Sequence, residues 1–242
     1  MDQYFKAIIE LQQRVMASQR PVLLEISEKM AEAIAADKKI FAFGTGHSHM
    51  LAEEGFCRAG GLAAVVPIFF SALMLHEDIP LSAQLERTPG LASGLLDRAK
   101  VQKGDMIFVF SNSGVNHLPV EMVIESKKRG LTTVSMGSLA FAQKAPLSAL
   151  KKRLVDVADY YIDNGGIAGD GMVEIPGVEW KVGPSSTVIG AMLWNALVTE
   201  TTRLVQARRG DAPVCASQNM PGAIAHNAKV AEKWHLAAGQ HL

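Results

Sequence analysis

The sequence predicts an α/β protein in which helices cover both faces of a five-stranded parallel sheet, forming a three-layer α-β-α sandwich. Short apolar segments, typical of strands buried on both faces, alternate with segments of helical periodicity. Two of these apolar segments end in turns rich in glycine, serine and threonine, and parallel sheets bind ligands beyond the carboxyl ends of their strands. With 242 residues, 48% of them hydrophobic, the chain can build one sizeable core, and we expect a single domain over residues 1–242.

The first 38 residues are predicted to form an N-terminal helical hairpin. Apolar residues recur at helical spacing from Gln3 to Ala17, and Pro21 is well placed to open a second helix that ends near Ala36. Proline suits the first turn of a helix because its missing N–H group would have no intrahelical partner there. We therefore expect two antiparallel helices before a core that spans residues 39–207.

The five predicted strands are separated for the most part by predicted helices. The segment DMIFVFS is the clearest strand, because it is short, apolar and bounded by polar residues. Strands that alternate with helices imply right-handed crossover connections, which produce a parallel sheet with helices on both sides. The strands are predicted at residues 40–44, 63–69, 105–111, 131–137 and 157–165, and the helices at 48–59, 91–101, 119–128 and, with a weaker pattern, 142–153.

From residue 182 the chain departs from this alternation and is predicted to form a C-terminal helical extension. Residues 182–207 combine Pro184 and a Ser-Ser-Thr cluster, which can cap a helix, with a long apolar body. This helix would pack on the sheet or on a partner subunit. Residues 208–242 are predicted to form a polar loop followed by a short tail helix.

Charge and hydropathy exclude several classes of protein. Twenty-four Lys and Arg residues balance twenty-four Asp and Glu residues, so no overall field would attract nucleic acid or an anionic membrane. No window reaches the roughly eighteen consecutive apolar residues of a membrane span, and the charges of Asp2 and Lys6 are unlike the start of a signal peptide. Cys57 and Cys215 lack the spacing of a zinc site or a redox dithiol. We expect a cytoplasmic protein with reduced cysteines.

The segment SNSGVN, residues 111–116, follows the clearest strand and precedes a predicted helix. Its polar groups would lie at the N-terminus of that helix, where unsatisfied N–H groups and the helix dipole both favour an anion. Ser113 or Asn116 could merely cap the helix, but a cap needs one residue and four candidate donors cluster here. We interpret the turn as a phosphate site that consists of Ser111, Asn112, Ser113, Gly114 and Asn116.

A second turn, GTGHS, follows the first predicted strand and repeats this pattern. Its glycines would let a ligand approach the backbone closely, and its other residues supply polar groups. It lacks the lysine of a Walker motif and the third glycine of the dinucleotide fingerprint, so nucleotide binding has little support. We expect Gly44, Thr45, Gly46, His47 and Ser48 to line the ligand site.

These two turns resemble those of the sugar isomerase, or SIS, family of phosphosugar-binding domains. In that family a G-x-G-x-S turn follows the first strand and an S-x-S-G-x-[ST] turn follows a later one. Asn116 replaces the usual hydroxyl residue and can still donate a hydrogen bond to a phosphate. Ser185, Ser186 and Thr187 resemble the family's third phosphate-proximal segment, at the start of a helix. The resemblance covers roughly residues 1–207 and implies a flavodoxin-like parallel core.

A segment near the C-terminus, PVCASQNMPG at residues 213–222, is similar to one that is typical of stand-alone SIS proteins described as phosphosugar-binding proteins or sugar isomerases. The resemblance implies that the ligand is a sugar phosphate. It also implies a homodimer, or a dimer of dimers, with shared sites. No cofactor is implied.

Aldose-ketose isomerisation needs a base that takes a proton from the carbon beside the carbonyl, and an acid that moves protons on the oxygens. Glu53 and Glu54 follow the GTGHS turn on a predicted helix, as acidic residues do in heptose-phosphate isomerases of the family. Glu54 stands four residues before Arg58 and could form only a surface ion pair with it. Glu53 shares a helix face with His49 instead. Both glutamates are candidates for the base.

Three further titratable residues are candidates for acid-base catalysis. His76 and Glu77 lie just beyond the second predicted strand, where some arabinose-phosphate isomerases of the family carry an HGD segment, and burial with mutual charge would separate their pKa values. No i, i+4 histidine pair accompanies them, so we predict no metal site. His226 resembles C-terminal histidines of the family that reach into a neighbouring subunit's site, although a lone histidine in a tail is usually just exposed.

The leading interpretation is a sugar-phosphate isomerase that works through an enediol. One alternative is a lyase similar to the muramic acid phosphate etherases, which have the same fold and begin with a similar proton abstraction. Another is a sugar-phosphate sensor that binds without turnover. The 39 residues before the first predicted strand are too few for a helix-turn-helix module in addition to the helical hairpin, so direct DNA binding is not expected.

Overall fold

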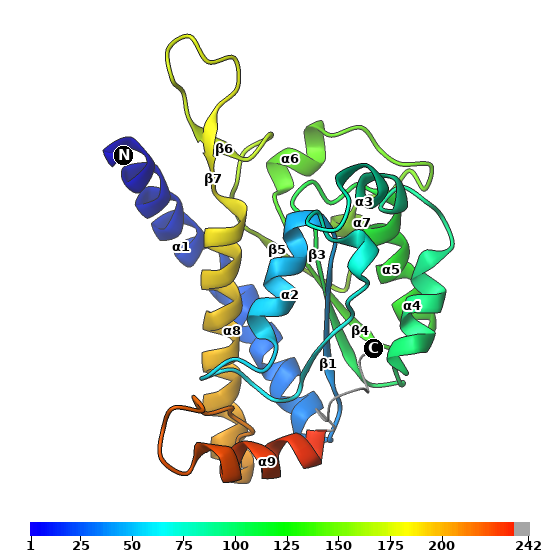
Figure 1. Cartoon of the computed structure of the whole chain (residues 1–242), viewed down its shortest axis with the longest axis vertical. Helices are drawn as coiled ribbons and strands as arrows, with labels where there is room; N and C mark the ends of the chain where they lie inside the picture. The colour runs from blue at the N-terminus through cyan, green and yellow to red at the C-terminus, as the bar shows by residue number, and fades with distance from the viewer. Residues whose placement is uncertain (235–242) are drawn as a thin grey trace.

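The computed structural model describes residues 1–234 and is built around one five-stranded parallel sheet with the strand order β2-β1-β3-β4-β5 (Figure 1). Each pair of neighbouring strands runs parallel, and Gly44 at the end of β1 lies opposite Phe110 at the end of β3. The predicted fold class is confirmed. The strands are β1 (Ile40–Gly44), β2 (Val65–Pro67), β3 (Met106–Phe110), β4 (Thr132–Gly137) and β5 (Tyr160–Asp163).

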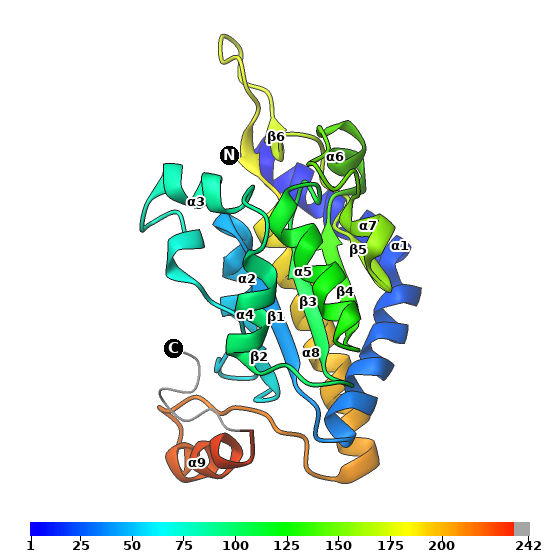
Figure 2. The ribbon, with the colours of Figure 1, turned by 90° about the vertical axis from the view of Figure 1, so that its right-hand side faces the viewer.

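Helices cover both faces of the sheet (Figures 1 and 2). One layer contains α1, α2 and α8, and the other contains α4, α5 and α7. Short helices, an antiparallel strand pair and α9 surround these layers. The bounds are α1 (Asp2–Ala35), η1 (Gly46–Ser48), α2 (His49–Gly55), η2 (Ser71–Leu73), α3 (Ile79–Leu85), α4 (Leu91–Ala99), α5 (His117–Lys128), α6 (Leu139–Lys144), α7 (Leu154–Val157), β6 (Gly171–Val173), β7 (Val182–Pro184), α8 (Ser186–Arg209) and α9 (Ala223–Trp234).

The sheet separates two hydrophobic cores, because successive side chains of a strand point to opposite faces. On β1, Ile40 and Ala42 belong to the core beneath α1 and α8, whereas Phe41 and Phe43 belong to the core beneath α4 and α5. All five residues of β1 and of β3 are buried, as the uninterrupted apolar runs predict for a parallel sheet covered on both sides.

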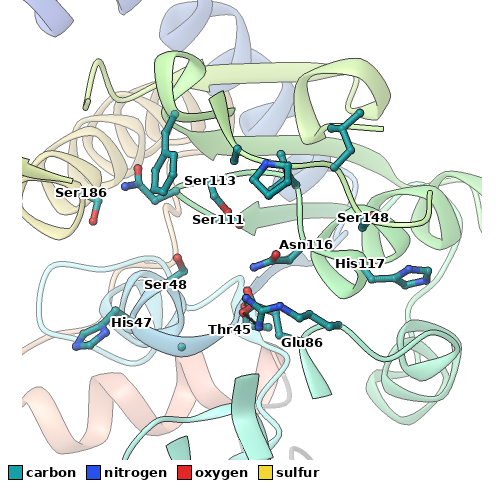
Figure 3. Close-up of a pocket in the computed structure, with 18 of the residues that line it drawn as sticks. Thr45, His47, Ser48, Glu86, Ser111, Ser113, Asn116, His117, Ser148 and Ser186 are labelled. Atoms are coloured by element: carbon teal, nitrogen blue, oxygen red, sulfur yellow. Dashed lines mark hydrogen bonds and ion pairs between the residues drawn. The ribbon is translucent and has the colours of Figure 1, made fainter. Parts of the chain in front are cut away.

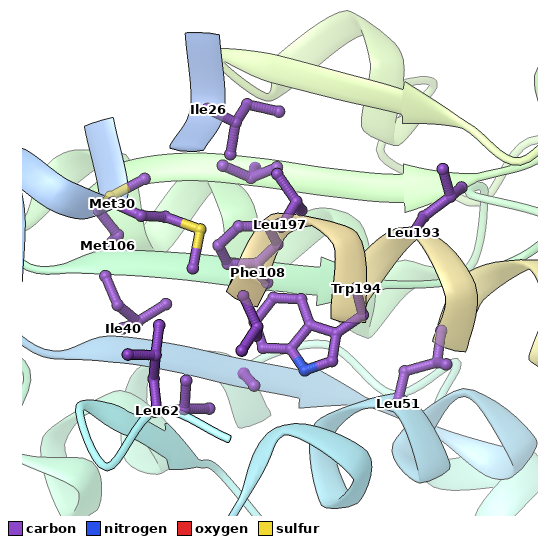
Figure 4. Packing of buried hydrophobic residues seen from close by; sticks show 14 of the residues in the cluster. Ile26, Met30, Ile40, Leu51, Leu62, Met106, Phe108, Leu193, Trp194 and Leu197 are labelled. Carbon is purple, nitrogen blue, oxygen red and sulfur yellow. The ribbon is translucent and has the colours of Figure 1, made fainter. Parts of the chain in front are cut away.

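Trp194 anchors the long helix α8 to the sheet (Figure 4). Its indole ring is fully buried and meets Phe108 and Phe110 edge to face, with ring centroids 4.7 and 5.5 Å apart. Edge-to-face aromatic pairs add about 0.5–1.5 kcal/mol each beyond the area that they bury. The start of α8 is thereby held near the carboxyl ends of β1 and β3.

The predicted N-terminal hairpin is wrong, because α1 runs without a break from Asp2 to Ala35 and contains Pro21 in its interior. An interior proline costs about 3 kcal/mol, because it removes one hydrogen bond and crowds the preceding turn. Apolar residues on both sides of Pro21 are buried against one continuous surface, which includes α8 and β5. Val15, Ile26 and Met30 are all buried there, and each contributes about 1.5–3 kcal/mol, which outweighs the cost of the proline.

Three other local predictions differ from the structure. The helix expected at 142–153 is replaced by α6 and α7, with an intervening loop that begins at Ala145 and contains Pro146. The helix expected at 48–59 ends at Gly55, where the indole of Trp194 leaves no room for a side chain. The antiparallel pair β6–β7, which projects from the body beyond the carboxyl ends of the strands, was not predicted (Figures 1 and 2).

Helix α9, in the described part of the C-terminal extension, lies at the opposite end of the molecule from this projecting pair (Figure 1). Helix α9 confirms the predicted tail helix as far as Trp234, and residues 235–242 of the predicted extension lie outside the described part of the chain. Across residues 1–234, none of the helices combines the length and the hydropathy that crossing a membrane requires.

Candidate functional site

A cleft of about 1000 Å³ opens at the carboxyl ends of β1 and β3 (Figure 3). In the strand order, β2 lies on one side of β1 and β3 on the other, so the chain leaves these two neighbouring strands in opposite directions. Such a switch point is where open parallel sheets bind ligands. The lining includes Thr45, Gly46, His47, Ser48, Glu86, Arg87, Ser111, Asn112, Ser113, Asn116, His117, Phe141, Leu147, Ser148, Asp170 and Ser186.

The GTGHS turn forms one wall of the cleft. A side chain at Gly44 would place its Cβ 2.4 Å from the carbonyl oxygen of Ser48, so only glycine permits the chain to fold back directly after β1. Thr45 is buried, and its hydroxyl donates a 2.6 Å hydrogen bond to Oε1 of Glu86. His47 and Ser48 follow in the short helix η1 and line the cleft, and the side chain of Ser48 points into it (Figure 3).

The SNSGVN turn forms the opposite wall, and hydrogen bonds within the turn and from Asn164 hold it in place. Gly114 has a φ of 63°, and its N–H group donates to Oγ of Ser111. The side chain of Asn112 is fixed by Nδ2 of Asn164, which donates to Oδ1 of Asn112 at 2.9 Å. In these hydrogen bonds, the side chains of Ser111 and Asn112 stabilise the turn itself.

Two side chains of the same turn are left free for a ligand. Among the described residues, the hydroxyl of Ser113 and the amide of Asn116 have no hydrogen-bond partner, and both line the cleft (Figure 3). Asn116 is the N-cap of α5, a helix of 12 residues, but its side chain does not cap it. Unsatisfied donors at this helix N-terminus favour an anion, so the cleft can hold a phosphate here without a lysine or an arginine.

The Ser-Ser-Thr segment at the start of α8 was expected to supply Ser185, Ser186 and Thr187 as phosphate donors, and the structure shows a different arrangement. Ser185 is completely buried, whereas Ser186 lines the main cleft and Thr187 lines a narrow extension of about 20 Å³. Both serine hydroxyls donate to the carboxylate of Asp170, at 3.0 Å from Ser185 and 2.6 Å from Ser186. The segment is therefore at the site, but the hydroxyl protons of Ser185 and Ser186 are already used.

The two glutamates predicted on the helix after GTGHS do not line the cleft of the single chain. Glu53 is exposed, and its Oε2 lies 3.8 Å from Nε2 of His49. Glu54 forms an ion pair with Arg58, the surface pairing that its spacing allowed, and also accepts a 2.7 Å hydrogen bond from Nδ2 of Asn195 on α8.

The other predicted acid-base residues also lie away from the lining of the cleft. His76 and Glu77 are exposed in the segment between η2 and α3, and the His76 ring lies 5.9 Å from the ring of His49. His226 belongs to α9, at the opposite end of the sheet, where its Nε2 lies 2.8 Å from the carbonyl oxygen of Val214. Within residues 1–234, no three His, Cys, Asp or Glu side chains are grouped so that they could hold a metal ion.

Two titratable residues that line the cleft, Glu86 and His117, were not among the predicted site residues. Glu86 lies directly after α3, and its carbonyl oxygen accepts a hydrogen bond from the N–H group of Leu118 at the start of α5. His117 is buried, with Nε2 3.8 Å from Oε1 of Glu121. His117 directly follows the SNSGVN turn and is the first residue of α5. Nothing local marks Glu86, because the pairing with Thr45 spans forty-one positions.

Comparisons with known proteins agree with this architecture. A family model described as the SIS domain matches residues 3–138 of the chain. A UPF0309 protein of Brucella canis is 37% identical over 238 residues, and the alignment covers 96% of this chain and 95% of the relative.

Two solved structures share the fold at low sequence identity. A phosphoheptose isomerase from Francisella tularensis matches with a TM-score of 0.58 and 11% identity, over 84% of this chain and 96% of that chain. A protein of Escherichia coli CFT073 in complex with a sugar phosphate matches with a TM-score of 0.51 and 15% identity, over 87% of this chain and 92% of that chain. At such identities the likeness concerns the fold alone.

Proposed function

Because this chain belongs to the SIS domain family, we propose that it binds a sugar phosphate in the cleft and interconverts its aldose and ketose forms through an enediol. The observation that carries the proposal is the meeting of the GTGHS and SNSGVN turns around one cleft at the ends of β1 and β3. The sugar-phosphate complex from Escherichia coli and the phosphoheptose isomerase, both with the same fold, support this class of ligand. The isomerase reaction needs no redox cofactor.

The phosphate is proposed to bind at the N-terminus of α5. Ser113 and Asn116 would donate from their side chains, and the backbone N–H groups of this turn would add further donors. Ser48 of the opposite wall faces the same space (Figure 3). The sugar would then extend from the phosphate along the cleft, between Glu86 and the start of α8.

Glu86 is proposed as the base that removes the proton from the carbon beside the carbonyl. One of its carboxylate oxygens accepts the hydrogen bond from Thr45, which orients the group. Its side chain is 20% exposed, so it is partly shielded from water but can still reach a ligand. His117 is proposed to move protons on the sugar oxygens, with Glu121 as the carboxylate that faces its Nε2.

A homodimer is proposed on the face of α1 and α8 that points away from the sheet. Phe5, Ile9 and Met16 expose more than half of their surface on α1. A largely apolar groove of about 330 Å³ between the two helices carries Arg20 and Glu200 among its lining residues, so two copies related by a two-fold axis could pair these opposite charges. In that assembly, Glu53, Glu54, His76, Glu77 or His226 of one copy could serve the site of the other.

The deciding experiment is proton NMR of the full chain in D2O with hexose, pentose, heptose and N-acetylhexosamine phosphates. Loss of the C2 proton signal of one sugar class is expected, since the base returns deuterium from solvent to the enediol. The Glu86→Gln variant is the control, and exchange should stop while the sugar still binds. Exchange that continues in that variant would assign the base elsewhere, with the predicted Glu53 and Glu54 next in order.

A non-catalytic sugar-phosphate sensor is the second candidate. It is favoured by one observation, namely that the five acid-base residues expected from the family resemblance do not line the cleft of the single chain. If sugar phosphates raise the melting temperature of the protein and every C2 proton signal persists, the sensor replaces the isomerase.

A further inference from the structure

A carboxylate of the chain itself occupies the N-terminus of α8 on the wall of the cleft. Oδ1 of Asp170 accepts hydrogen bonds from the backbone N–H groups of Ser185 and Ser186, at 3.0 and 2.9 Å, and from the hydroxyl of Ser185 at 3.0 Å. Oδ2 accepts a fourth bond, from the hydroxyl of Ser186 at 2.6 Å. The positive end of this 24-residue helix is thus already compensated by a built-in negative charge.

These bonds convert Ser186 from a possible phosphate donor into an acceptor. A serine hydroxyl carries one proton, and Ser186 gives that proton to Asp170. Its oxygen can then offer only lone pairs to the cleft, and Oδ2 of Asp170, with a single partner, also retains acceptor capacity. The side of the cleft formed by Ser186 and Asp170 therefore attracts hydroxyl or amino groups, whereas a second phosphate there would face a like charge.

The backbone holds this carboxylate in place. Asp170 has a φ of 65°, a conformation that residues other than glycine seldom adopt. The following Gly171 pairs with Pro184 in the β6–β7 ladder, and a side chain there would come within 2.3 Å of the carbonyl oxygen of Lys181. With four hydrogen bonds and a fixed strand after it, Asp170 is a preorganised part of the cleft wall.

The two ends of the cleft thus have opposite preferences. At the α5 end, among the residues that the structure describes, Ser113 and Asn116 have free polar groups, and no carboxylate caps the helix. At the α8 end, Ser186 and Asp170 offer acceptors, and Asp170 carries a negative charge.

We infer that Asp170 is a specificity-determining residue that restricts the ligand to a single anionic group. This inference rests on the proposed function: the phosphate lies at the α5 turn, and the uncharged or amino-bearing end of the sugar lies at Asp170 and Ser186. The substrate class is a sugar monophosphate. Sugar bisphosphates and phosphorylated sugar acids are rejected, because their second anionic group meets the carboxylate of Asp170 in a partly enclosed cleft.

The test is calorimetric titration of the full chain with two matched pairs of probes, fructose 6-phosphate against fructose 1,6-bisphosphate and ribulose 5-phosphate against ribulose 1,5-bisphosphate. The wild-type protein should bind the monophosphate of at least one pair about tenfold or more tightly than the bisphosphate, a difference of about 1.4 kcal/mol. Asp170→Asn removes the charge at nearly unchanged shape and should reduce the ratio to about threefold or less. Ser186→Ala keeps the charge and should preserve the preference.

Equal binding of both members of a pair by the wild-type protein would overturn the inference without touching the proposed function. So would an unchanged ratio in Asp170→Asn, provided that its melting temperature shows a folded protein. If that variant does not fold, the ratio of the wild-type protein's affinities for monophosphate and bisphosphate still decides whether the inference holds. If the wild-type protein binds none of the four sugar phosphates, and inorganic phosphate does not bind either, the proposed function fails and this inference fails with it.

Discussion

The hydroxyl of Thr45 lies 2.6 Å from Oε1 of Glu86 and joins the turn after β1 to the segment that leads into α4. A residue in the first ligand turn therefore orients the proposed base. This relationship makes Thr45 a positioning residue, and the two side chains should have separable effects on the reaction.

Glu86→Gln should lower the rate of C2 proton exchange by about 100-fold or more, because general base catalysis typically contributes 10²–10⁴-fold. Sugar-phosphate affinity should change little, since the amide keeps the shape of the side chain. Thr45→Val should cause a smaller loss, mainly in kcat, since the base stays in place without its hydrogen bond. Equal exchange rates in Glu86→Gln and the wild-type protein would remove Glu86 from the mechanism.

Ser113→Ala should weaken sugar-phosphate binding by roughly tenfold or more, because a hydrogen bond to a charged group is worth about 1.5–3 kcal/mol. Ser148→Ala is the matched control, since Ser148 lines the same cleft outside the two turns and should leave the affinity within about twofold. Calorimetric titration with the sugar phosphate found by NMR measures both. Unchanged affinity in Ser113→Ala means that the phosphate binds elsewhere.

Gly44→Ala should destabilise the protein by about 1–3 kcal/mol, because the added Cβ would meet the backbone of Ser48 at 2.4 Å. Gly94→Ala is the opposite control, because Gly94 lies in α4 and nothing approaches its Cβ position within 4 Å. Alanine at this position should raise the free energy of unfolding by about 0.5–1 kcal/mol. Urea unfolding of both variants measures the difference. A neutral Gly44→Ala would show that the turn after β1 can rearrange.

Asp159→Asn should lower stability at neutral pH but not in acid. Burial alone would raise the pKa of Asp159, but hydrogen bonds from Lys127 and Thr133 outweigh it and hold the pKa below its ordinary value. A carboxyl group with a depressed pKa stabilises the fold above its unfolded-state pKa, and this contribution disappears as the pH falls through the native value. The free energy of unfolding of the wild-type protein should therefore exceed that of the variant by about 1 kcal/mol at pH 7, and this gap should close toward pH 3.

Urea unfolding as a function of pH measures this gap. Glu174→Gln is the control, because Glu174 lies in the loop that joins β6 and β7, with a side chain that is 79% exposed. Its ion pair with Lys181 is open to solvent, so this variant should show little dependence on pH. A gap that stays constant between pH 7 and pH 3 would mean that the charge of Asp159 is not what stabilises the fold.

Ile9→Asp should dissociate the proposed homodimer, because a charge would enter the apolar face of α1, where Ile9 is 52% exposed. Ile175→Asp is the control, since Ile175 is 41% exposed but lies in the loop that joins β6 and β7. Light scattering after size-exclusion chromatography reports the mass of both variants. A wild-type monomer of 26.0 kDa at micromolar concentration would contradict the proposed dimer.

Most of the fold could be predicted because its signals are local. The runs that end at Gly44 and Phe110 are apolar, short and closed by small polar residues, and the structure has strands at both. Pro21 gave a misleading local signal, since proline does start a helical turn in many proteins. Burial on both sides of it keeps α1 continuous, and that depends on α8, which lies far away in sequence.

The residues of the candidate site also divide into those that local sequence signals predict and those that only distant contacts place there. Ser113 and Asn116 could be predicted because they share a segment with the strand and helix that position them. Glu86 and Asp170 could not, because each becomes part of the cleft through hydrogen bonds to residues that are distant in sequence or lie across a strand pair. The family resemblance directed attention to Glu53 instead, which is exposed in the single chain.

The packing of α1 on α8 has a consequence for synthesis of the chain (Figure 1). Helix α1 buries Leu11, Val15 and Ile26 in a core that includes α8, and α8 is synthesised about 150 positions after the end of α1. At typical elongation rates, that interval is roughly 10–30 s. During this time the apolar side of α1 lacks its partner, so the nascent chain depends on chaperones, or on provisional contacts with the half-made sheet, to avoid aggregation.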